Sequence, residues 1–430
     1  MARAVSTFLK PGANPYETHP HAYKERRQAY LSGDAFRVLS LVTDEGGCGW
    51  YRIRQMLREL DKQNIASTYI LKAQDKEKEI SMAVEMADVI IYRKGNEDMV
   101  RALRTVAPDK PFIFDHDDNT FIIQPSNEHY LGHGTEDVWV ETESGPTPVW
   151  VHGITPHFDK YENRRKQIDL QYSLEQSDLN TAPTELLAGV WEEYNGNAKV
   201  VPNCINFEWY PNVEIRDRDK GDEFRIGWQG GVSHMGDFQE VGSGISRLME
   251  EDKDVVYYSV GSFYQVFFPN VLDRCRVLPW IDFTAHGYRM ASLDLDVAVI
   301  PLQDITFNSY KSEIKFSEFA AMGVPCVVQN RTPYKEHIQD GITGLLFDDG
   351  KEFYEQLKRI RTDGELREKI IKNAYEWVRE NRNLATWAPK ILDIYKEVWA
   401  SKTSTTSTKE KSSSTGKKRK KKRGKKKRNR

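Results

Sequence analysis

The sequence predicts two α/β domains, each a doubly wound and mainly parallel sheet, which face each other across a cleft. Short apolar runs, typical of buried strands, alternate with helical segments in two successive series, and this alternation indicates parallel sheets. A polar stretch at 212–223 separates the two series. In each series the first strand runs directly into a glycine-rich loop, at 44–54 and at 225–237.

The elements of the first series follow from their apolar patterns. The helix after the first glycine-rich loop carries Ile53, Met56, Leu57 and Leu60 on one face, as an amphipathic helix does. Asn96 is a plausible cap for a second helix. The predicted strands are 36–42, 67–71, 89–92, 112–114, 178–181 and 200–201. The first predicted helix begins near residue 53, and two more cover 97–107 and 185–194.

The second series has the same alternation and ends in several helices. Its predicted strands are 224–227, 255–260, 295–300, 326–329 and 345–347, and its predicted helices are 312–322, 352–361, 364–380 and 384–400. We therefore divide the chain into an N-terminal arm (1–33), a first domain (34–210) with an inserted loop (119–165), a second domain (211–383), a C-terminal helix (384–400) and a tail (401–430).

Composition narrows the class of protein. At 430 residues the chain is long enough for two domains with their own cores. No apolar run reaches 18 residues, and the N-terminus lacks the apolar stretch of a secretory signal. The four cysteines are far apart and form no CxxC pair, which argues against a disulfide framework or structural zinc. We expect a cytoplasmic protein.

Charge is distributed very unevenly along the chain. Residues 401–430 carry 15 Lys and Arg against the single acid Glu410, a net charge of +14. Since the whole chain has a formal charge of -2, the remainder carries -16. Such asymmetry points to a polyanionic partner for the tail. The tail's Ser, Thr, Lys and Gly content cannot build a core, so we predict that it is disordered.

The segment that carries most chemical information begins where a strand of the second series ends, at Pro301. We predict that Ser312 caps the following helix, whose positive amino end suits a phosphate. Lys311 and Lys315 are four residues apart, so both could face one anion. Glu318 shares a helical face with Lys315. A cation for a diphosphate beside a carboxylate for ribose hydroxyls is what a nucleoside diphosphate requires.

The run KFSEFAAMGVPCVV, followed by DGITGLLF, resembles the donor-site signature of GT-B glycosyltransferases, particularly the large retaining group called family 4. The second Glu of that family's E-x7-E pair matches Glu318, whereas the first falls on Tyr310, so this sequence departs from the full motif. The variant pattern, FN-x2-KS before K-x2-E, resembles the pattern of a branch of these glycosyltransferases that is found in bacteria and phages. The resemblance implies a GT-B fold, a nucleotide-sugar donor, retention of configuration and a last helix that packs back on the first domain.

Both glycine-rich loops have counterparts in that family. Gly230 and Gly231 follow a strand, and His234 comes shortly after; glycine allows backbone amides to approach a phosphate. The resemblance places this loop beside the donor phosphates. Gly47 lies in the equivalent loop of the first domain, and we predict that Arg52 reaches a phosphate or the acceptor. The simpler interpretations are a tight strand–helix turn for the second-domain loop and an exposed helical arginine for Arg52.

Three carboxylates follow the strand at 112–114, namely Asp115, Asp117 and Asp118. The carboxyl ends of strands are where α/β sheets place their sites. Aligning the strands puts Asp117 where family 4 enzymes often carry a His near the transferred sugar. Asp117 or Asp118 could position the acceptor hydroxyl. Clustered carboxylates also suit Mg²⁺ or Mn²⁺, and turn formation is a third interpretation. We rank metal binding second and expect no metal cofactor.

The most consistent function is transfer of a sugar from a nucleotide diphosphate sugar to an acceptor hydroxyl. The acceptor could be a modified DNA base or a cell-surface glycan, with the tail binding DNA or an anionic membrane surface. A tail that only solubilises the protein or folds against its own acidic body also remains open. The alternatives for the whole chain are a GT-B sugar-nucleotide epimerase and a non-enzymatic nucleic-acid-binding protein. VPNCIN at 201–206 resembles the family's linker between domains.

Overall fold

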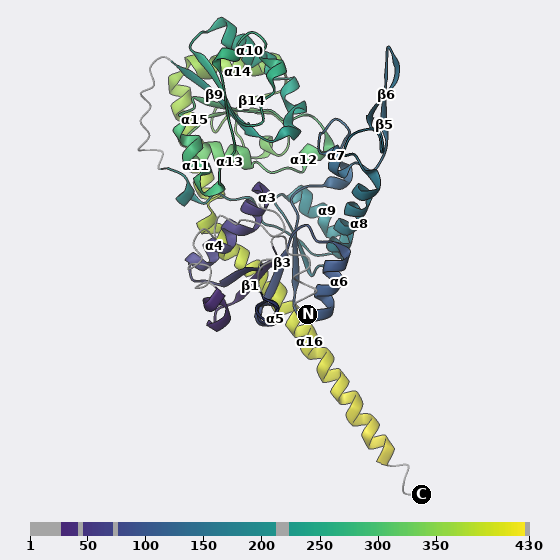
Figure 1. The fold of residues 1–430 in the computed structure, drawn as a ribbon. Helices are drawn as coiled ribbons and strands as arrows, with labels where there is room; N and C mark the ends of the chain where they lie inside the picture. Colours follow the sequence, from purple (N-terminus) through teal and green to yellow (C-terminus); the bar gives the residue numbers. More distant parts are fainter. Residues whose placement is uncertain (1–26, 42–45, 72–75, 212–222, 426–430) are drawn as a thin grey trace.

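The computed structural model describes residues 27–41, 46–71, 76–211 and 223–425, with side chains to Ser404. Two α/β domains lie one above the other, and the last helix runs along the first of them (Figure 1). This is the doubly wound, two-sheet architecture that the sequence predicts. Within these ranges, no helix combines the length and the apolar character that crossing a bilayer requires.

The first domain is built on a six-stranded parallel sheet. Its strands lie in the order β2 (Ser67–Leu71), β1 (Arg37–Leu41), β3 (Val89–Tyr92), β4 (Phe112–Asp115), β7 (Leu179–Ala182) and β8 (Ala198–Val200). Alternate side chains enter opposite cores: Leu39 packs on one face and Val38 on the other. One face is covered by α5 (Glu77–Met86), α6 (Glu97–Val106), α8 (Lys160–Gln176) and α9 (Glu185–Asn195), and the other by α4 (Gln55–Lys62) and the last helix.

The second domain repeats this plan. Its parallel strands lie in the order β11 (Cys275–Leu278), β10 (Val255–Gly261), β9 (Phe224–Gly230), β12 (Val297–Ile300), β13 (Cys326–Gln329) and β14 (Leu345–Phe347). α10 (Gly242–Glu251) and α14 (Gly350–Thr362) cover one face, α11 (Phe283–Ser292) and α13 (Ile314–Ala321) the other, and α15 (Gly364–Asn381) contributes to both cores. The sequence did not predict β11, whose middle residues are exposed and break the apolar pattern.

The strand order reverses in both sheets beside the first strand of each series. β1 lies between β2 and β3, and β9 lies between β10 and β12. Doubly wound sheets bind ligands outside the carboxyl ends of the strands at such a reversal. The loops after β1, β3, β9 and β12 are therefore the ones that the fold brings to the two ligand-binding edges.

The insertion at 119–165 is more ordered than a loop. It contains a short helix, α7 (Tyr130–His133), and an antiparallel hairpin of β5 (Val138–Thr142) and β6 (Gly145–Trp150). The hairpin stands away from the first domain (Figure 1). Gly145, with φ of 98°, lies at its turn, where a left-handed conformation favours glycine.

The described end of the N-terminal arm belongs to the first domain. Residues 27–32 are helical, and Tyr30 is fully buried with its hydroxyl donating to the carbonyl of Ala83 at 2.9 Å. The prediction of an arm over the whole of 1–33 is therefore wrong for its last residues, because one aromatic side chain anchors them in the core. Residues 1–26 lie outside the described part.

The last helix, α16 (Leu384–Lys425), starts where the chain returns to the first domain. The two segments that connect the domains, near Ile205 and near Asn383, lie side by side. The Ile205 amide donates to the carbonyl of Arg382 at 2.7 Å, and the Leu384 amide donates to the carbonyl of Ile205 at 2.9 Å. Buried apolar side chains from Leu384 to Val398 then pack against α4 and the first sheet.

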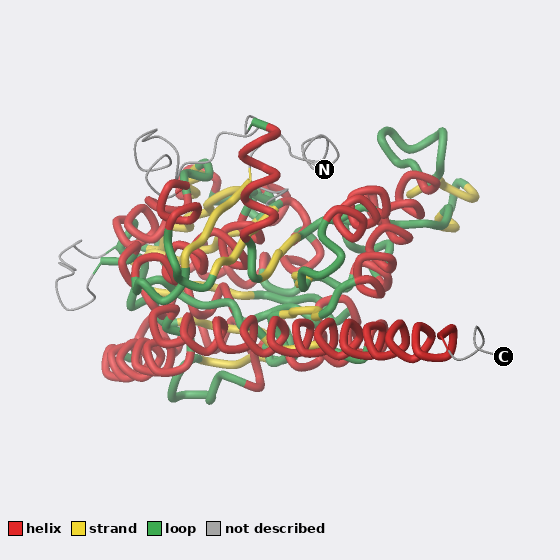
Figure 2. Tube along the Cα trace, turned by 90° about the horizontal axis from the view of Figure 1, so that it is seen from below, coloured by secondary structure: helices red, strands yellow, loops and turns green. Residues whose placement is uncertain are grey.

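α16 does not end at residue 400, the boundary that the sequence predicts. It continues as one long helix to Lys425 (Figure 2), and its last turns project away from both domains (Figure 1). This part is rich in Ser, Thr and Lys and lacks an apolar face, so tertiary packing adds little to its helical stability. Disorder of the tail stays a prediction from composition.

Candidate active site

Lys315 and Glu318 project from α13 near the carboxyl ends of β9 and β12. The helix forms because Phe316, Phe319 and Ala320 are buried in the second core, which leaves Lys315 and Glu318 facing the site. Gly323, with φ of 68°, follows the helix end in a left-handed conformation. The predicted Lys–Glu helical face is therefore present, but the two side chains bind different partners.

The start of α13 differs from the prediction. Ser312 does not cap the helix: its hydroxyl accepts a hydrogen bond from Asn203 Nδ2 at 2.7 Å, and the residue at the cap position, Glu313, makes no capping bond. The carboxylate of Glu313 instead accepts from Arg382. Contacts with the chain segments that cross between domains thus take the place of a side-chain cap.

Lys315 is held in a chain of polar contacts. Its Nζ lies 2.8 Å from His234 Nε2, and His234 Nδ1 lies 2.5 Å from Asp237 Oδ2. Burial, followed by the charge of Lys315, lowers the pKa of His234 to about 3, so the imidazole is neutral. Its Nε2 then accepts a hydrogen bond from the Lys315 ammonium, and its Nδ1–H donates to Asp237. The sequence placed His234 beside the donor, and the structure brings it to Lys315.

Lys311 lies before the start of α13, and its positive charge affects the pKa of Lys315. α12 (Thr306–Ser309) ends before Lys311 and α13 begins after it, so the prediction that both lysines share the first turn of one helix is wrong. They are nevertheless close enough to interact. Burial and then the charge of Lys311 lower the pKa of Lys315 to about 8. Two neighbouring cations therefore face the same region, an arrangement that an anion would stabilise.

Glu318 is bonded from both domains. The hydroxyl of Tyr51, in the first domain, donates to Oε1, and Gln229 Nε2 at the end of β9 donates to Oε2 at 2.8 Å. Glu318 is 7% exposed, and burial raises its pKa to about 7. Its partners are neutral hydrogen-bond donors, and the position suits a carboxylate that binds hydroxyl groups.

Gly230 and Gly231 lie where β9 ends. A Cβ atom on Gly230 would lie 2.5 Å from the Trp228 ring and 3.0 Å from His234 Cδ2. A larger residue would therefore push His234 away from the strand end. A Cβ on Gly231 would meet nothing within 4 Å, so this residue borders open space. The glycine-rich loop thus allows His234 to approach the sheet and leaves room beside it.

The equivalent loop of the first domain leads into an unusual helix. Gly47 begins a single turn, α3 (Gly47–Gly49), which continues as a π-helix, η2 (Trp50–Arg54). π-Helical turns are rare and occur frequently at functional sites. The Trp50 ring stacks on Phe283 of the second domain with a centroid distance of 6.0 Å. This segment therefore contacts the opposite domain beside Glu318.

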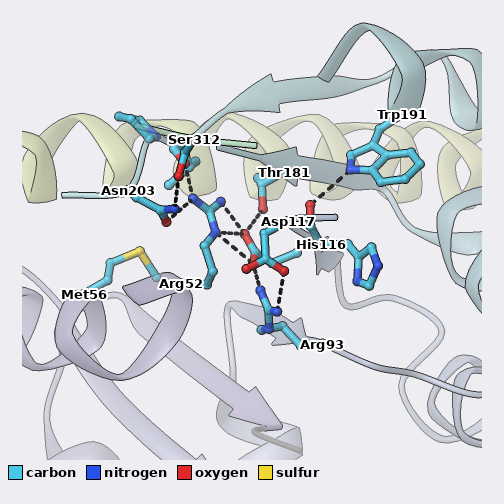
Figure 3. A network of polar contacts seen from close by, with 12 residues as sticks. Arg52, Met56, Arg93, His116, Asp117, Thr181, Trp191, Asn203 and Ser312 are labelled. Atoms are coloured by element: carbon cyan, nitrogen blue, oxygen red, sulfur yellow. Dashed lines mark hydrogen bonds and ion pairs between the residues drawn. The ribbon is translucent and has the colours of Figure 1, made fainter. Parts of the chain in front are cut away.

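Arg52 does not reach a phosphate or an acceptor, contrary to the prediction. It is 2% exposed, and its guanidinium donates to Asp115, to the carbonyl of Val201 and to Asn203 (Figure 3). A buried carboxylate with such a partner is stable only as a pair. Since Asn203 also donates to Ser312, Arg52 supports the contact between domains rather than the chemistry.

The carboxylates after β4 have three different environments. Arg93, which follows β3, donates to Asp115 Oδ1 at 2.7 Å and to Asp117 Oδ1 at 2.8 Å (Figure 3). Asp115 also accepts from Thr181 Oγ1 at 2.7 Å and is buried within the sheet edge. The side-chain carboxylate of Asp118 accepts no hydrogen bond from any residue that the structure describes, whereas its main-chain carbonyl accepts from the Thr120 amide at 3.0 Å. The cluster predicted from sequence is thus divided by one arginine.

These environments separate the two candidate acceptor carboxylates. Burial opposes ionisation of Asp117, but the charge of Arg93 and the hydrogen bond that it donates hold the pKa of Asp117 below the usual value. Burial and the charge of Asp117 raise the pKa of Asp118 to about 6. Asp118 is therefore the member of the pair that can exchange a proton near neutral pH.

Cys48, Asp117 and Asp118 bring their potential ligand atoms within 4.8 Å of one another. As a metal site this group fits poorly, because Asp117 is already bonded by the Arg93 guanidinium. A thiol beside two carboxylates is also a mixed donor set, whereas Mg²⁺ prefers oxygen ligands alone.

Sequence reasoning missed Tyr51, Gln229, His286 and Arg93. Gln229 directly precedes the glycine pair at a strand end, which was a usable signal. His286 Nε2 lies 2.6 Å from Gln229 Oε1, and Tyr51 reaches Glu318 across the domains. No local pattern connects these residues.

Residues 247–393 match a family model described as glycosyl transferase-like. No curated protein matches the chain. Among solved structures, a glycosyltransferase from Rickettsia africae is similar with a TM-score of 0.54 at 14% identity, over 85% of this chain and 99% of that one. HepE of Anabaena in complex with UDP is similar with a TM-score of 0.53 at 14% identity, over 84% of this chain and 100% of that one. Sucrose-phosphate synthase from Thermosynechococcus elongatus has a TM-score of 0.54 at 14% identity, over 85% of this chain and 100% of that one.

At this identity the solved structures establish the fold, which is the GT-B fold that the sequence resemblance implies. The family match covers most of the second domain and the beginning of α16, including α13 with Lys315 and Glu318. The chain thus has the GT-B fold, and its second domain matches a glycosyl transferase-like family model, so the two findings together indicate an enzyme of the glycosyltransferase class.

Proposed function

We propose that the protein transfers a glycosyl group from a nucleoside diphosphate sugar to an acceptor hydroxyl, with retention of configuration. The observation that carries this proposal is the pair on α13: a partly buried Lys315 beside a second cation, and Glu318 three residues further on. They lie at the reversal of the second sheet, where doubly wound folds bind nucleotides. Solved structures of HepE, which shares the fold, contain UDP and UDP-glucose.

The donor is bound by charge and hydrogen bonding in this proposal. Lys315 and Lys311 neutralise the diphosphate, and neutral His234 directs the Lys315 ammonium. The backbone at Gly230 and Gly231 approaches the phosphates, since no side chain intervenes there. Glu318 accepts hydrogen bonds from the ribose hydroxyls.

The reaction breaks the bond between the anomeric carbon and the phosphate oxygen, and the electron pair leaves with the diphosphate. The lysines stabilise that developing charge. The acceptor oxygen forms the new bond to the anomeric carbon, and its proton passes to a diphosphate oxygen or to Asp118. Asp118 is the better of the two carboxylates for this role because Asp117 is bound to Arg93. No metal enters this scheme.

We further propose that the basic tail recruits a polyanionic acceptor or an anionic surface. A charge of +14 on 401–430, against -16 on the rest of the chain, favours a partner that the acidic body alone would repel. Modified DNA bases are the acceptor that this charge distribution and the phage-like donor motif favour, and a glycan at an anionic membrane surface is the alternative.

The test is a screen of the purified protein against nucleotide sugars, measured as release of nucleoside diphosphate. In the active combination, Glu318→Ala and Lys315→Ala should each lower kcat/KM about ten- to a hundredfold, since each removes a charge-assisted contact. Glu355→Ala, a matched change on the exposed face of α14, should leave kcat/KM unchanged. Wild-type kinetics in both folded donor-site variants would overturn the assignment.

A further inference from the structure

A segment of the first domain lies on the donor side of the second. The Trp50 ring stacks on Phe283 and meets Trp209 edge-on, with centroid distances of 6.0 and 6.3 Å. A Cβ on Gly47 would lie 3.6 Å from Phe283. We call residues 47–54 the crossing segment, because they connect the end of β1 to the face of the second domain that carries Glu318.

Tyr51 is the polar contact of the crossing segment. Its hydroxyl donates to Glu318 Oε1 and lies 3.3 Å from the hydroxyl of Tyr210. The other carboxylate oxygen is bonded by Gln229, which His286 holds in turn. Both oxygens of this nearly buried carboxylate are therefore occupied by groups of the protein itself.

A ribose hydroxyl and the Tyr51 hydroxyl are chemically equivalent for Glu318, since each is a neutral O–H donor. Gln229 comes from the same domain as Glu318 and remains beside it in any arrangement of the domains. Tyr51 comes from the other domain and lies in a π-helical turn, a less stable form than the α-helix that follows it. Tyr51 is thus the partner that a nucleotide would replace.

We propose that Tyr51 keeps the donor site closed by occupying, on Glu318, the place of the ribose hydroxyls. Nucleotide binding releases the crossing segment from the second domain. This inference rests on the proposed function, because it takes Glu318 as the ribose ligand.

Release of the crossing segment has a consequence at the acceptor side. Cys48 belongs to this segment, and its thiol sulfur lies within 4.8 Å of carboxylate oxygens of Asp117 and Asp118. Donor binding therefore alters the surroundings of the acceptor carboxylates, and the acceptor binds after the donor.

Tyr51→Phe tests the inference, because it removes the competing hydroxyl and keeps the ring. The probes are UDP, ADP, GDP and dTDP, with affinity measured by calorimetry on the full-length protein. A nucleotide that binds should bind Tyr51→Phe about three- to tenfold more tightly than wild type, the value of one ordinary hydrogen bond. Tyr172→Phe, the same change on α8 far from the donor site, should leave the affinity unchanged.

Equal or weaker binding by a folded Tyr51→Phe variant, verified by its thermal melting, would overturn the inference. Hydrogen exchange gives an independent measurement on the wild type: amides of the crossing segment should exchange faster when the nucleotide is saturating. Slower or unchanged exchange there would also overturn it.

Failure of the proposed function would look different. If neither wild type nor Tyr51→Phe binds any of the four nucleotides, the donor assignment itself is wrong. If wild type binds one and Glu318→Ala does not, the donor site stands, and the comparison of Tyr51→Phe with wild type decides the role of Tyr51 alone.

Discussion

The lowered pKa of Lys315 predicts that donor binding weakens in mildly alkaline solution. The proposed site requires the ammonium form, and an amine loses its proton as the pH rises through its pKa. Because the pKa is about 8, roughly nine-tenths of the free protein carries this charge at pH 7 and roughly one-tenth at pH 9. The donor kcat/KM, which reports the free enzyme, should therefore fall about fivefold between pH 8 and pH 9, an interval in which Glu318, with a pKa of about 7, is already ionised.

Two substitutions separate Lys315 from other causes of an alkaline decline. Lys315→Met should lower kcat/KM about ten- to a hundredfold at pH 7 and abolish the decline. Lys311→Met removes the charge that, after burial, contributes most to the low pKa, so the decline should move to higher pH. Lys369→Met, on the exposed face of α15, serves as the matched control and should keep the wild-type profile.

The assay is nucleoside diphosphate release at limiting donor concentration, from pH 6.5 to 9.5 at constant ionic strength. A flat wild-type profile over this range would refute the assignment of Lys315. The same decline in Lys315→Met would attribute it to another group. If Lys311→Met kept the wild-type midpoint, the interaction between the two lysines would be refuted instead.

Three further outcomes are expected. Chelation by EDTA should leave turnover unchanged, since lysines neutralise the diphosphate; loss of activity that Mg²⁺ or Mn²⁺ restores would favour the Cys48, Asp117 and Asp118 group. Arg52→Met should destabilise the fold by about 3–5 kcal/mol in urea unfolding, because it leaves the Asp115 carboxylate short of a partner; unchanged stability would contradict the structural role. Removal of 405–430 keeps the contact of Lys402 with Asp178 and should preserve activity on a small acceptor. It should reduce binding to DNA or anionic vesicles at low salt only, and full binding by the truncated protein would refute recruitment.

Much of the fold follows from local pattern. Runs such as those at 89–92 and 297–300 are apolar at every position, and a strand buried on both faces needs such a run. Helix α6 begins at its predicted cap, where the Asn96 side chain accepts from the Met99 amide. The hairpin within 119–165 and the anchoring of Tyr30 were not predictable in this way, because they depend on single contacts rather than on periodicity.

The candidate site is also partly readable from the sequence. The spacing of Lys315 and Glu318 on a helix, and the glycines at the end of β9, are local features that do not depend on tertiary contacts. The sequence could not tell Asp117 from Asp118, since the difference comes from Arg93, 24 residues before Asp117. The sequence likewise could not show whether Arg52 is exposed or buried, since its partners Asp115 and Val201 are also distant in the chain.

By itself, then, the sequence determined two doubly wound domains and the helix that carries the donor residues, because periodicity and short spacings are properties of neighbouring residues. Only the tertiary structure decided which charged groups remain available to a ligand. Arg52 meets Val201 over a separation of 149 residues, and Tyr51 meets Glu318 over 267. The first pair is brought together by the folding of the first domain and the second by the packing of one domain on the other, and no local pattern encodes either.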